Sequence, residues 1–447
     1  MKRLIVPCSV ALLASVFTFC APTAARAAKS AALNAELART IRSDQNLRDV
    51  HQMALNLLKS GFNAGAGYKA VWIRDLNTFI QVALEVNPPT RVREALVTFF
   101  KFQGADGDVV DLYFPIDPAK IRPTYRSSPL APGLMADKNT VEVDQESSLV
   151  QAVYKFVAGT GDRSILDEQV GGRTVRERLG LALEYVLTQH FDAKHGLVWG
   201  ATRADWGDIQ PESPHGTVLD AHSHRALCIY DNAMLLLAIS DYVQLLGADS
   251  PEAQRWSETG DRLRRNIRKV LWDTKHQKFF PHVYLDGSPF PEHFDENAIY
   301  YHGGTAVAIE AGLLSHREVA GALAHMDADA REAHAATIGL TMYPPYPLGF
   351  FKNPAMTAPY SYQNGGDWTW FGGRMVQDLV VQGYAADAYR ELQPMVARVK
   401  RAGSFYEWWT PENKPRGSSD FRGSAGVLAR AIEMLEAWAE QQPTSRE

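Results

Sequence analysis

The feature that most restricts the fold of this chain is a regular alternation of helical patterns and loops. About twelve helical patterns follow one another between residues 31 and 439, with almost no strand signal. Every second pattern follows a long loop that is rich in aromatic residues, acids and glycine, whereas the other connections are short and plain. This alternation predicts six pairs of an outer and an inner helix closed into a ring. All inner helices would begin at one face, and the rich loops would gather there.

The expected helices have clear starts and stops in the sequence. They cover residues 31–59, 75–85, 90–102, 143–160, 175–190, 230–246, 251–271, a stretch from 302, 315–328, 369–382, 385–401 and 423–439. A small β-hairpin is expected over residues 279–294, around Asp286-Gly287. No change of composition marks a second domain, so residues 28–447 are expected to form one all-α domain with long loops.

The first 27 residues have the features of a secretory signal peptide. Lys2 and Arg3 precede an apolar run over residues 4–20, and Ala25-Arg26-Ala27 matches an A-x-A cleavage signal. An uncleaved anchor is the alternative, but the run is short for a membrane span. A lipoprotein site at Cys20 is weaker still, because bulky residues precede that cysteine. A periplasmic or secreted protein is expected.

Charge and cysteine content exclude several other classes. The net charge of −5 becomes −8 once the signal peptide, with three basic residues and no acid, is removed. No basic patch suggests nucleic acid, and no later stretch is apolar enough to cross a membrane. Cys228 is the one cysteine outside the signal peptide, so no intrachain disulfide is expected.

The first rich loop, GYKAVWIRDLNTF at residues 67–79, offers groups suited to a sugar. Trp72 has a flat face on which a sugar ring can stack. Arg74 and Asp75 supply hydrogen-bond donors and acceptors for neighbouring hydroxyls. The alternative is a helix start with a solvated charge pair. Similar loops before the other inner helices favour the sugar site.

Two later loops carry candidate catalytic carboxyls. In RADWGD, at residues 203–208, Asp205 and Asp208 flank Trp206. A carboxyl beside an apolar ring loses solvation and its pKa rises, as a general acid at neutral pH requires. The alternative is a surface turn.

In FYEWW, at residues 405–409, four aromatic residues, Trp408 among them, enclose Glu407. An unpaired charge in such surroundings is costly, so a catalytic base explains it better than structure does. The alternative is a glutamate that points to solvent from an aromatic rim. Asp420 is a possible third acid.

Weaker candidates complete the set. In YQNGGDWTW, at residues 362–370, the glycines allow close approach of a ligand, two amides can bind hydroxyls and two tryptophans can stack; these side chains are Gln363, Asn364, Trp368 and Trp370. A helix-capping turn is the alternative. Gln145 lies in a first helical turn that favours acidic neighbours anyway. His222-Ser223-His224 has no third metal ligand at familiar spacing, so neither metal nor cofactor is expected.

Taken together, these motifs resemble those of the six-hairpin (α/α)6-barrel glycosidases. The first resembles the Trp-x-Arg-Asp stretch of glucoamylases, trehalases and family 63 glucosidases, which implies sugar-binding roles for Trp72, Arg74 and Asp75. The stretch over residues 205–208 resembles the Asp-Trp-Asn-Asp of cellobiose- and chitobiose-type phosphorylases, which carries the general acid. The resemblance implies Asp208 as that acid, with Asp205 second.

The end of the chain resembles the last motif of glucoamylases and family 63 enzymes. Glu407 is followed by Pro411, Gly417 and FRGSA at residues 421–425, and the resemblance implies that Glu407 is the catalytic base. Two departures stand out. Many relatives carry an amino-terminal β-sandwich that is not seen in this sequence, and Gly207 replaces the asparagine of the phosphorylases.

The expected function is that of an exported, inverting glycoside hydrolase, exo-acting on a small α-glucoside or related oligosaccharide. A glycoside phosphorylase or a non-catalytic carbohydrate-binding protein on the same barrel are alternatives. A polysaccharide lyase that uses Tyr230, His222 and Arg225 is a third. In an inverting hydrolase the carboxyls of Asp208 and Glu407 should lie roughly 6.5–9.5 Å apart.

Overall fold

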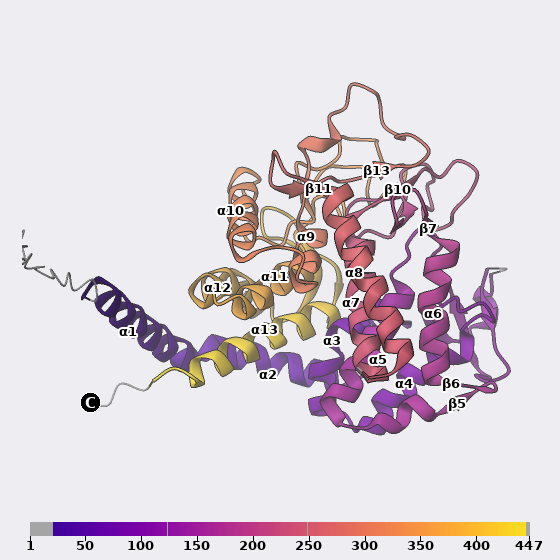
Figure 1. The fold of residues 1–447 in the computed structure, drawn as a ribbon, viewed down its shortest axis with the longest axis horizontal. Coiled ribbons are helices and arrows are strands. Elements are labelled where there is room, and N and C mark those ends of the chain that lie inside the picture. Colours follow the sequence, from indigo (N-terminus) through magenta and orange to yellow (C-terminus); the bar gives the residue numbers. More distant parts are fainter. Residues whose placement is uncertain (1–20, 123, 248, 444–447) are drawn as a thin grey trace, which may run out of the picture.

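The computed structural model describes residues 21–122, 124–247 and 249–443. Most of the expected signal peptide, residues 1–20, lies outside the described residues. Its last seven residues begin helix α1 (Ala21–Ser43). Figure 1 shows α1 projecting from the body of the molecule beside α13, which it contacts.

Six helices form a closed inner ring. They are α3 (Ile73–Val86), α5 (Gln145–Thr160), α7 (Ile229–Leu246), α9 (His302–Glu310), α11 (Thr369–Val381) and α13 (Arg422–Glu440). Each packs against the next in this order, and α13 packs against α3. The structure therefore confirms the (α/α)6 barrel expected from the alternation of loops.

The outer helices cover this ring. They are α1, α2 (Gln45–Lys59), α4 (Pro89–Phe102), α6 (Val175–Gln189), α8 (Pro251–Leu271), α10 (His316–Glu332) and α12 (Ala385–Ala402). In α8, Trp256, Leu263 and Ile267 recur at helical spacing and are buried, while most of the exposed positions are charged. The inner helix α7 is instead buried around most of its circumference, because it has neighbours on all sides.

Two expectations about the elements are wrong. The single helix expected over residues 31–59 is two helices, because Asp44 adopts an extended backbone and its side chain accepts a hydrogen bond from the Asn46 amide, which starts α2. The hairpin expected over residues 279–294 does not form. Asp286 pairs instead with Arg225 of a distant loop, at 2.7 Å, and draws the turn toward it.

The strands are short and lie in the loops between helices. A four-stranded antiparallel sheet joins the long loop after α4 to the start of α3, in the order β1 (Val71–Trp72), β2 (Leu112–Pro115), β4 (Leu134–Asp137) and β3 (Arg126–Ser127). Its register places Trp72 opposite Leu112. A second sheet pairs β10 (Arg225–Leu227) with β13 (Val283–Tyr284) and β9 (Gly200–Ala201).

The remaining pairs have two strands each. They are β5 (Gln169–Val170) with β6 (Arg173–Thr174), β7 (Phe191–Asp192) with β8 (Leu197–Val198), β11 (Trp272–Asp273) with β12 (Lys278–Phe279), β14 (Tyr300–Tyr301) with β15 (Met342–Tyr343), and β16 (Tyr406–Trp409) with β17 (Pro415–Ser419). Single turns of 3-10 helix are η1 (Pro118–Lys120), η2 (Arg163–Asp167) and η3 (Glu296–Ala298). Most of these strands have too few residues for a two-residue alternation of apolar and polar side chains to be visible in the sequence.

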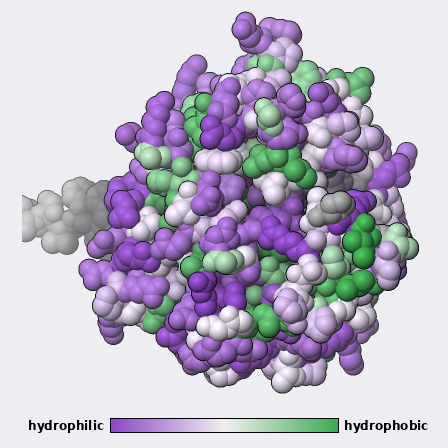
Figure 2. Space-filling model, turned by 90° about the vertical axis from the view of Figure 1, so that its right-hand side faces the viewer, coloured by the Kyte–Doolittle hydropathy of each residue, from purple (hydrophilic) through white to green (hydrophobic). Residues whose placement is uncertain are grey.

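Besides the main core, the loops around the start of α9 have a small apolar core of their own. It comprises Ala204, Ile209, Phe290, Ile299, Tyr301, Met342, Tyr346, Phe351 and Met356. The face shown in Figure 2 is mainly hydrophilic, with hydrophobic residues in scattered groups. Within the described ranges, every helix falls short of the length or apolar character that a membrane span requires.

Candidate active site

A cavity lies where the inner helices begin. It is lined by Ala64, Tyr68, Trp72, Arg74, Asp75, Asp111, Glu142, Trp206, Asp208, Tyr362, Gln363, Trp368, Trp370, Glu407 and Phe421. These residues come from the loops before α3, α5, α7, α11 and α13 and from the first turns of α3 and α11. Its volume is about 110 Å³. A buried water needs roughly 10–15 Å³ of such space, so the cavity has room for roughly 7–11 waters. That space is comparable to the size of one hexose ring with its hydroxyls.

The structure brings most of the predicted site residues to this cavity. They are Trp72, Arg74, Asp75, Trp206, Asp208, Gln363, Trp368, Trp370 and Glu407. Asp208 and Glu407 share the cavity although 199 positions separate them in the sequence. Closure of the ring therefore places the two predicted catalytic carboxyls in one chamber.

Asp208 is held by its main chain, while its side chain stays available. The Asp208 amide donates to the Gln363 side-chain oxygen at 3.2 Å, and the Asp208 carbonyl accepts from the Asn139 side chain at 2.8 Å. The Asp208 Oδ1 atom is buried and has no hydrogen-bond partner within the described part of the chain. A ligand in the cavity could therefore take the hydrogen bond that this carboxyl lacks.

Glu407 is buried and held by hydrogen bonds. The Tyr68 hydroxyl lies 2.9 Å from each carboxylate oxygen, and the Ser418 amide donates to Oε2 at 2.9 Å. Burial raises the pKa of Glu407, and the Ser418 and Tyr68 hydrogen bonds oppose that rise. The negative charge of Asp208 raises the pKa further, so the two carboxyls are electrostatically linked.

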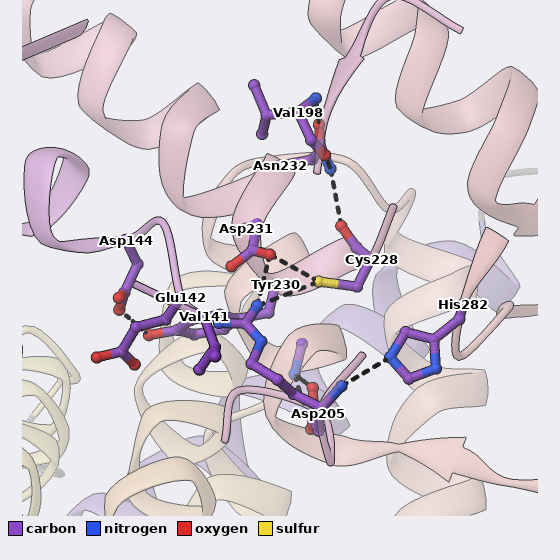
Figure 3. A network of polar contacts seen from close by, with 12 residues as sticks. Val141, Glu142, Asp144, Val198, Asp205, Cys228, Tyr230, Asp231, Asn232 and His282 are labelled. Atoms are coloured by element: carbon purple, nitrogen blue, oxygen red, sulfur yellow. Dashed lines mark hydrogen bonds and ion pairs between the residues drawn. The ribbon is translucent and has the colours of Figure 1, made fainter. Parts of the chain in front are cut away.

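Arg74 is fully engaged by acidic neighbours at the base of the cavity. Its guanidinium donates to both oxygens of Asp144, at 2.7 and 3.0 Å, and also pairs with Glu142. The Tyr230 hydroxyl donates to Asp144 at 2.8 Å. Figure 3 shows Glu142, Asp144 and Tyr230 close together in this network. Burial disfavours a charged Asp144, but the Arg74 ion pair holds the pKa of that carboxyl below its usual value.

Two further acids face the cavity in a different state. Burial raises the pKa of Asp75 to about 7 and that of Asp111 to about 8. The Asp75 Oδ1 atom is buried without a hydrogen-bond partner among the described residues. Near neutral pH both carboxyls are therefore substantially protonated, so each can donate as well as accept a hydrogen bond to a sugar hydroxyl.

The prediction of Asp205 as an alternative acid is corrected by its position. Its side chain does not line the cavity and is 1% exposed. Its carboxylate oxygens accept from the amides of Gly303 and Gly304, at 2.7 and 2.8 Å. Asp205 thus faces the amino end of α9, because the tight turn around Trp206 directs Asp205 and Asp208 to different sides.

Three predicted substrate-binding residues also lie elsewhere. Gln145 donates to the Asn139 carbonyl at 2.9 Å, and Asn364 binds the main chain of Tyr346. Trp408 packs near Tyr362 instead of lining the cavity. Burial alternates along β16: Glu407 and Trp409 are buried, whereas Tyr406 and Trp408 are partly exposed, so Glu407 and Trp408 lie on different sides of the strand.

The structure adds four polar lining residues that the sequence did not single out. They are Tyr68, Asp111, Glu142 and Tyr362. Tyr68 lies within the motif at residues 67–79, and Tyr362 is the first residue of the motif at residues 362–370, so their membership of these motifs could have indicated them. Asp111 and Glu142 lie in the long loop between α4 and α5, where no local pattern distinguishes them from other acids.

The three side chains of the lyase alternative are dispersed. Tyr230 is occupied with Asp144, Arg225 pairs with Asp286 on an exposed loop, and His222 lies in an exposed turn. His224 pairs with Glu212 at 2.8 Å. Asp420 hydrogen-bonds to Ser404 at 2.8 Å and is exposed, so it is not placed as a third acid in the cavity.

Comparison with known proteins places these observations in a family. The model of the glycosyl hydrolase 94 superfamily catalytic domain matches residues 50–347. This range includes Asp208 and ends before Glu407. No curated protein sequence matches the chain.

Solved structures similar to this one support the fold. The GH63 mannosylglycerate hydrolase of Thermus thermophilus, in complex with Tris and D-glycerate, has a TM-score of 0.59 at 17% identity, with 85% of this chain and 99% of that chain covered. The rhamnosidase of Klebsiella oxytoca with rhamnose bound has a TM-score of 0.55 at 16% identity, with 87% and 63% covered. At such low identity the likeness concerns the barrel alone.

Proposed function

The chain belongs to the glycosyl hydrolase 94 superfamily, and on that premise we propose that it is an exported, inverting glycoside hydrolase. Its substrate is a small α-glucoside or a related oligosaccharide, from whose end it removes one sugar. Export rests on the features of residues 1–27, and exo-action rests on a cavity that suits about one hexose. The observation that carries the proposal is the presence of Asp208 and Glu407 in one chamber.

In this mechanism the two carboxyls have opposite tasks. Asp208 protonates the oxygen of the leaving group as the glycosidic bond breaks, and Glu407 takes a proton from a water that attacks the opposite face of the sugar. The free Oδ1 of Asp208 and the hydrogen-bonded carboxylate of Glu407 support this assignment. The expected separation of roughly 6.5–9.5 Å, which leaves room for that water, stays a prediction.

Water is favoured over phosphate as the nucleophile by the charges around the cavity. Its lining includes five carboxyl residues: Asp75, Asp111, Glu142, Asp208 and Glu407. Arg74 is the one Lys or Arg in that lining among the described residues, and two carboxylates already neutralise it. A phosphate dianion binds best to unpaired cations. A phosphorylase would also have no use for a base at Glu407.

The test is a screen of aryl glycosides and disaccharides, with and without inorganic phosphate, followed by proton NMR of the first product. We expect turnover without phosphate and a sugar released with inverted anomeric configuration. A phosphate requirement would establish the phosphorylase alternative, and a retained configuration would exclude the inverting mechanism. Tight sugar binding without any turnover would favour the carbohydrate-binding alternative.

A Tyr68→Phe substitution is expected to move the acidic limb of the pH dependence of kcat/KM to higher pH. Glu407 must be deprotonated to act as a base, and the Tyr68 hydrogen bond stabilises that form. Burial raises the pKa of Glu407 and this hydrogen bond lowers it, so the pKa rises further once the hydroxyl is removed. The measurement is a pH–rate profile of both proteins. Tyr125→Phe, in the loop after α4, serves as control, and an unchanged or acid-shifted limb in Tyr68→Phe would contradict this role.

A further inference from the structure

The loop that carries Asp208 is anchored at its start by Arg203. The Arg203 side chain is 1% exposed and donates to Asp231 at 2.5 Å. Its amide donates to His282 Nε2 at 3.4 Å, and its carbonyl accepts from the Tyr301 hydroxyl at 3.1 Å. In Figure 3, one dashed line joins His282 to the main chain next to Asp205, and another joins Cys228 to Asp231. Arg203 is therefore held through both its main chain and its side chain.

His282 and Tyr301 are both linked to one half-buried acid, Glu296: His282 directly and Tyr301 through Tyr346. The Glu296 carboxylate lies 2.9 Å from His282 Nδ1 and 2.6 Å from the Tyr346 hydroxyl. The Tyr346 hydroxyl is in turn 2.6 Å from that of Tyr301. With Nδ1 donating to Glu296, His282 Nε2 is free to accept from Arg203. The start of the loop is thus tied to the segments that carry His282, Glu296, Tyr301 and Tyr346 by a connected set of hydrogen bonds.

The middle of the loop docks on the amino end of α9 through Asp205. Its two side-chain oxygens accept hydrogen bonds from the amides of Gly303 and Gly304, at 2.7 and 2.8 Å, in the first turn of the helix. A side chain on Gly303 would place its Cβ 2.3 Å from Trp206 Cδ1, and one on Gly304 would come within 2.8 Å of Asp205 Oδ1. This close approach explains the two glycines in the first turn of α9.

We propose that Asp205 is a positioning residue for the general acid. By binding the start of α9 it fixes the turn at Trp206, so that Asp208 faces the cavity when its own main chain binds Asn139 and Gln363. This inference rests on the proposed function, because it takes Asp208 as the acid. Asp205 itself touches no substrate.

The signature of this role is a dependence on the leaving group. A misaligned acid slows the cleavage of a bond whose leaving group needs a proton, as in an alkyl glycoside or a disaccharide. The fluoride of a glycosyl fluoride departs without full protonation, so the cleavage rate of that substrate is affected little. Damage to the sugar site or to the base would instead slow both substrates alike.

The experiment compares Asp205→Asn with the native protein on an alkyl glycoside and on the glycosyl fluoride of the same sugar. Asparagine keeps the shape of the side chain but replaces one of the two oxygens that accept from the α9 amides with an NH₂ group, which cannot accept. We expect kcat on the alkyl glycoside to fall about 100-fold, the order of loss for a group misplaced by about 1 Å. The fluoride rate is expected to fall less than about threefold, with KM unchanged for both. Tyr301→Phe, which removes a more distant anchor, should show the same pattern to a smaller degree.

Asp261→Asn, at an exposed position of α8, is the matched control and should behave as the native protein. Equal losses on both substrates, or no loss in Asp205→Asn, would overturn the positioning role. Should Asp205→Asn not fold, the pattern in Tyr301→Phe decides, and equal losses there would overturn the proposal too. If Asp208→Asn retains full activity on the alkyl glycoside, the assignment of Asp208 as the acid is wrong, and if the native protein cleaves neither substrate, the proposed function itself is wrong, so these failures can be told apart from that of the positioning role.

Discussion

Replacement of Glu407 with glutamine is expected to lower kcat by about 10²–10⁴-fold, the usual contribution of a general base. The amide keeps the volume of the carboxylate and can still accept from Tyr68 and Ser418. It cannot take a proton from the attacking water. The loss should therefore be similar for good and poor leaving groups, since both need the same nucleophile.

The control for this variant lies on the same pair of strands. Glu412 is exposed between β16 and β17, where it hydrogen-bonds to Thr410, and Glu412→Gln should leave kcat unchanged. Burial raises the pKa of Glu407, so an ionised Glu407 is less favourable in the folded state than in the unfolded state. Removal of this charge in Glu407→Gln should therefore not lower the melting temperature at neutral pH. A Glu407→Gln protein with more than about a tenth of native activity would refute Glu407 as the base.

The second large effect is expected from Asp208→Asn. This change removes the proton that the leaving oxygen receives, so kcat on a disaccharide or alkyl glycoside should fall by about 10²–10⁴-fold. Hydrolysis of a glycosyl fluoride should be retained in large part. Asp220→Asn, in an exposed turn of the same loop region, is the control. Equal loss on fluoride and alkyl substrates would argue against Asp208 as the acid.

The same variant also tests the electrostatic link between the two carboxyls. The charge of Asp208 raises the pKa of Glu407, so its removal should lower that pKa. With the fluoride as substrate, the acidic limb of the rate profile in Asp208→Asn should then lie at lower pH than in the native protein. This shift is opposite in sign to the one expected for Tyr68→Phe, so the two variants check each other.

The match to the glycosyl hydrolase 94 superfamily covers the loops of Trp72 and Asp208 but not that of Glu407. The base is therefore assigned from the resemblance of the last motif and from the cavity. Closure of the ring supports that assignment, because α13 packs against α3 and thereby brings β16, which carries Glu407, beside Tyr68.

Several features of this protein could be predicted from the sequence because they depend on local patterns. Amphipathic periods mark most outer helices, and long apolar runs mark inner ones such as α7. The placement of aromatic and acidic loops before every second helix was enough to infer the ring and the face that carries the site. Trp72, Asp208 and Glu407 could be chosen because each lies in a loop whose composition is unusual for a mere connection.

What only the tertiary structure decided depends on contacts between distant segments. Asp205 and Asp208 lie in one short loop on either side of Trp206, and no local rule says which of them faces the cavity. The docking of that loop on α9, about 100 residues later in the chain, makes the choice. Asp111 enters the site because its loop pairs with the start of α3, where the Ile73 amide donates to the Asp111 carbonyl. Helical periodicity is encoded within a few residues, whereas such pairings exist only once the ring has closed, and for that reason they could not be predicted from any single stretch of the sequence.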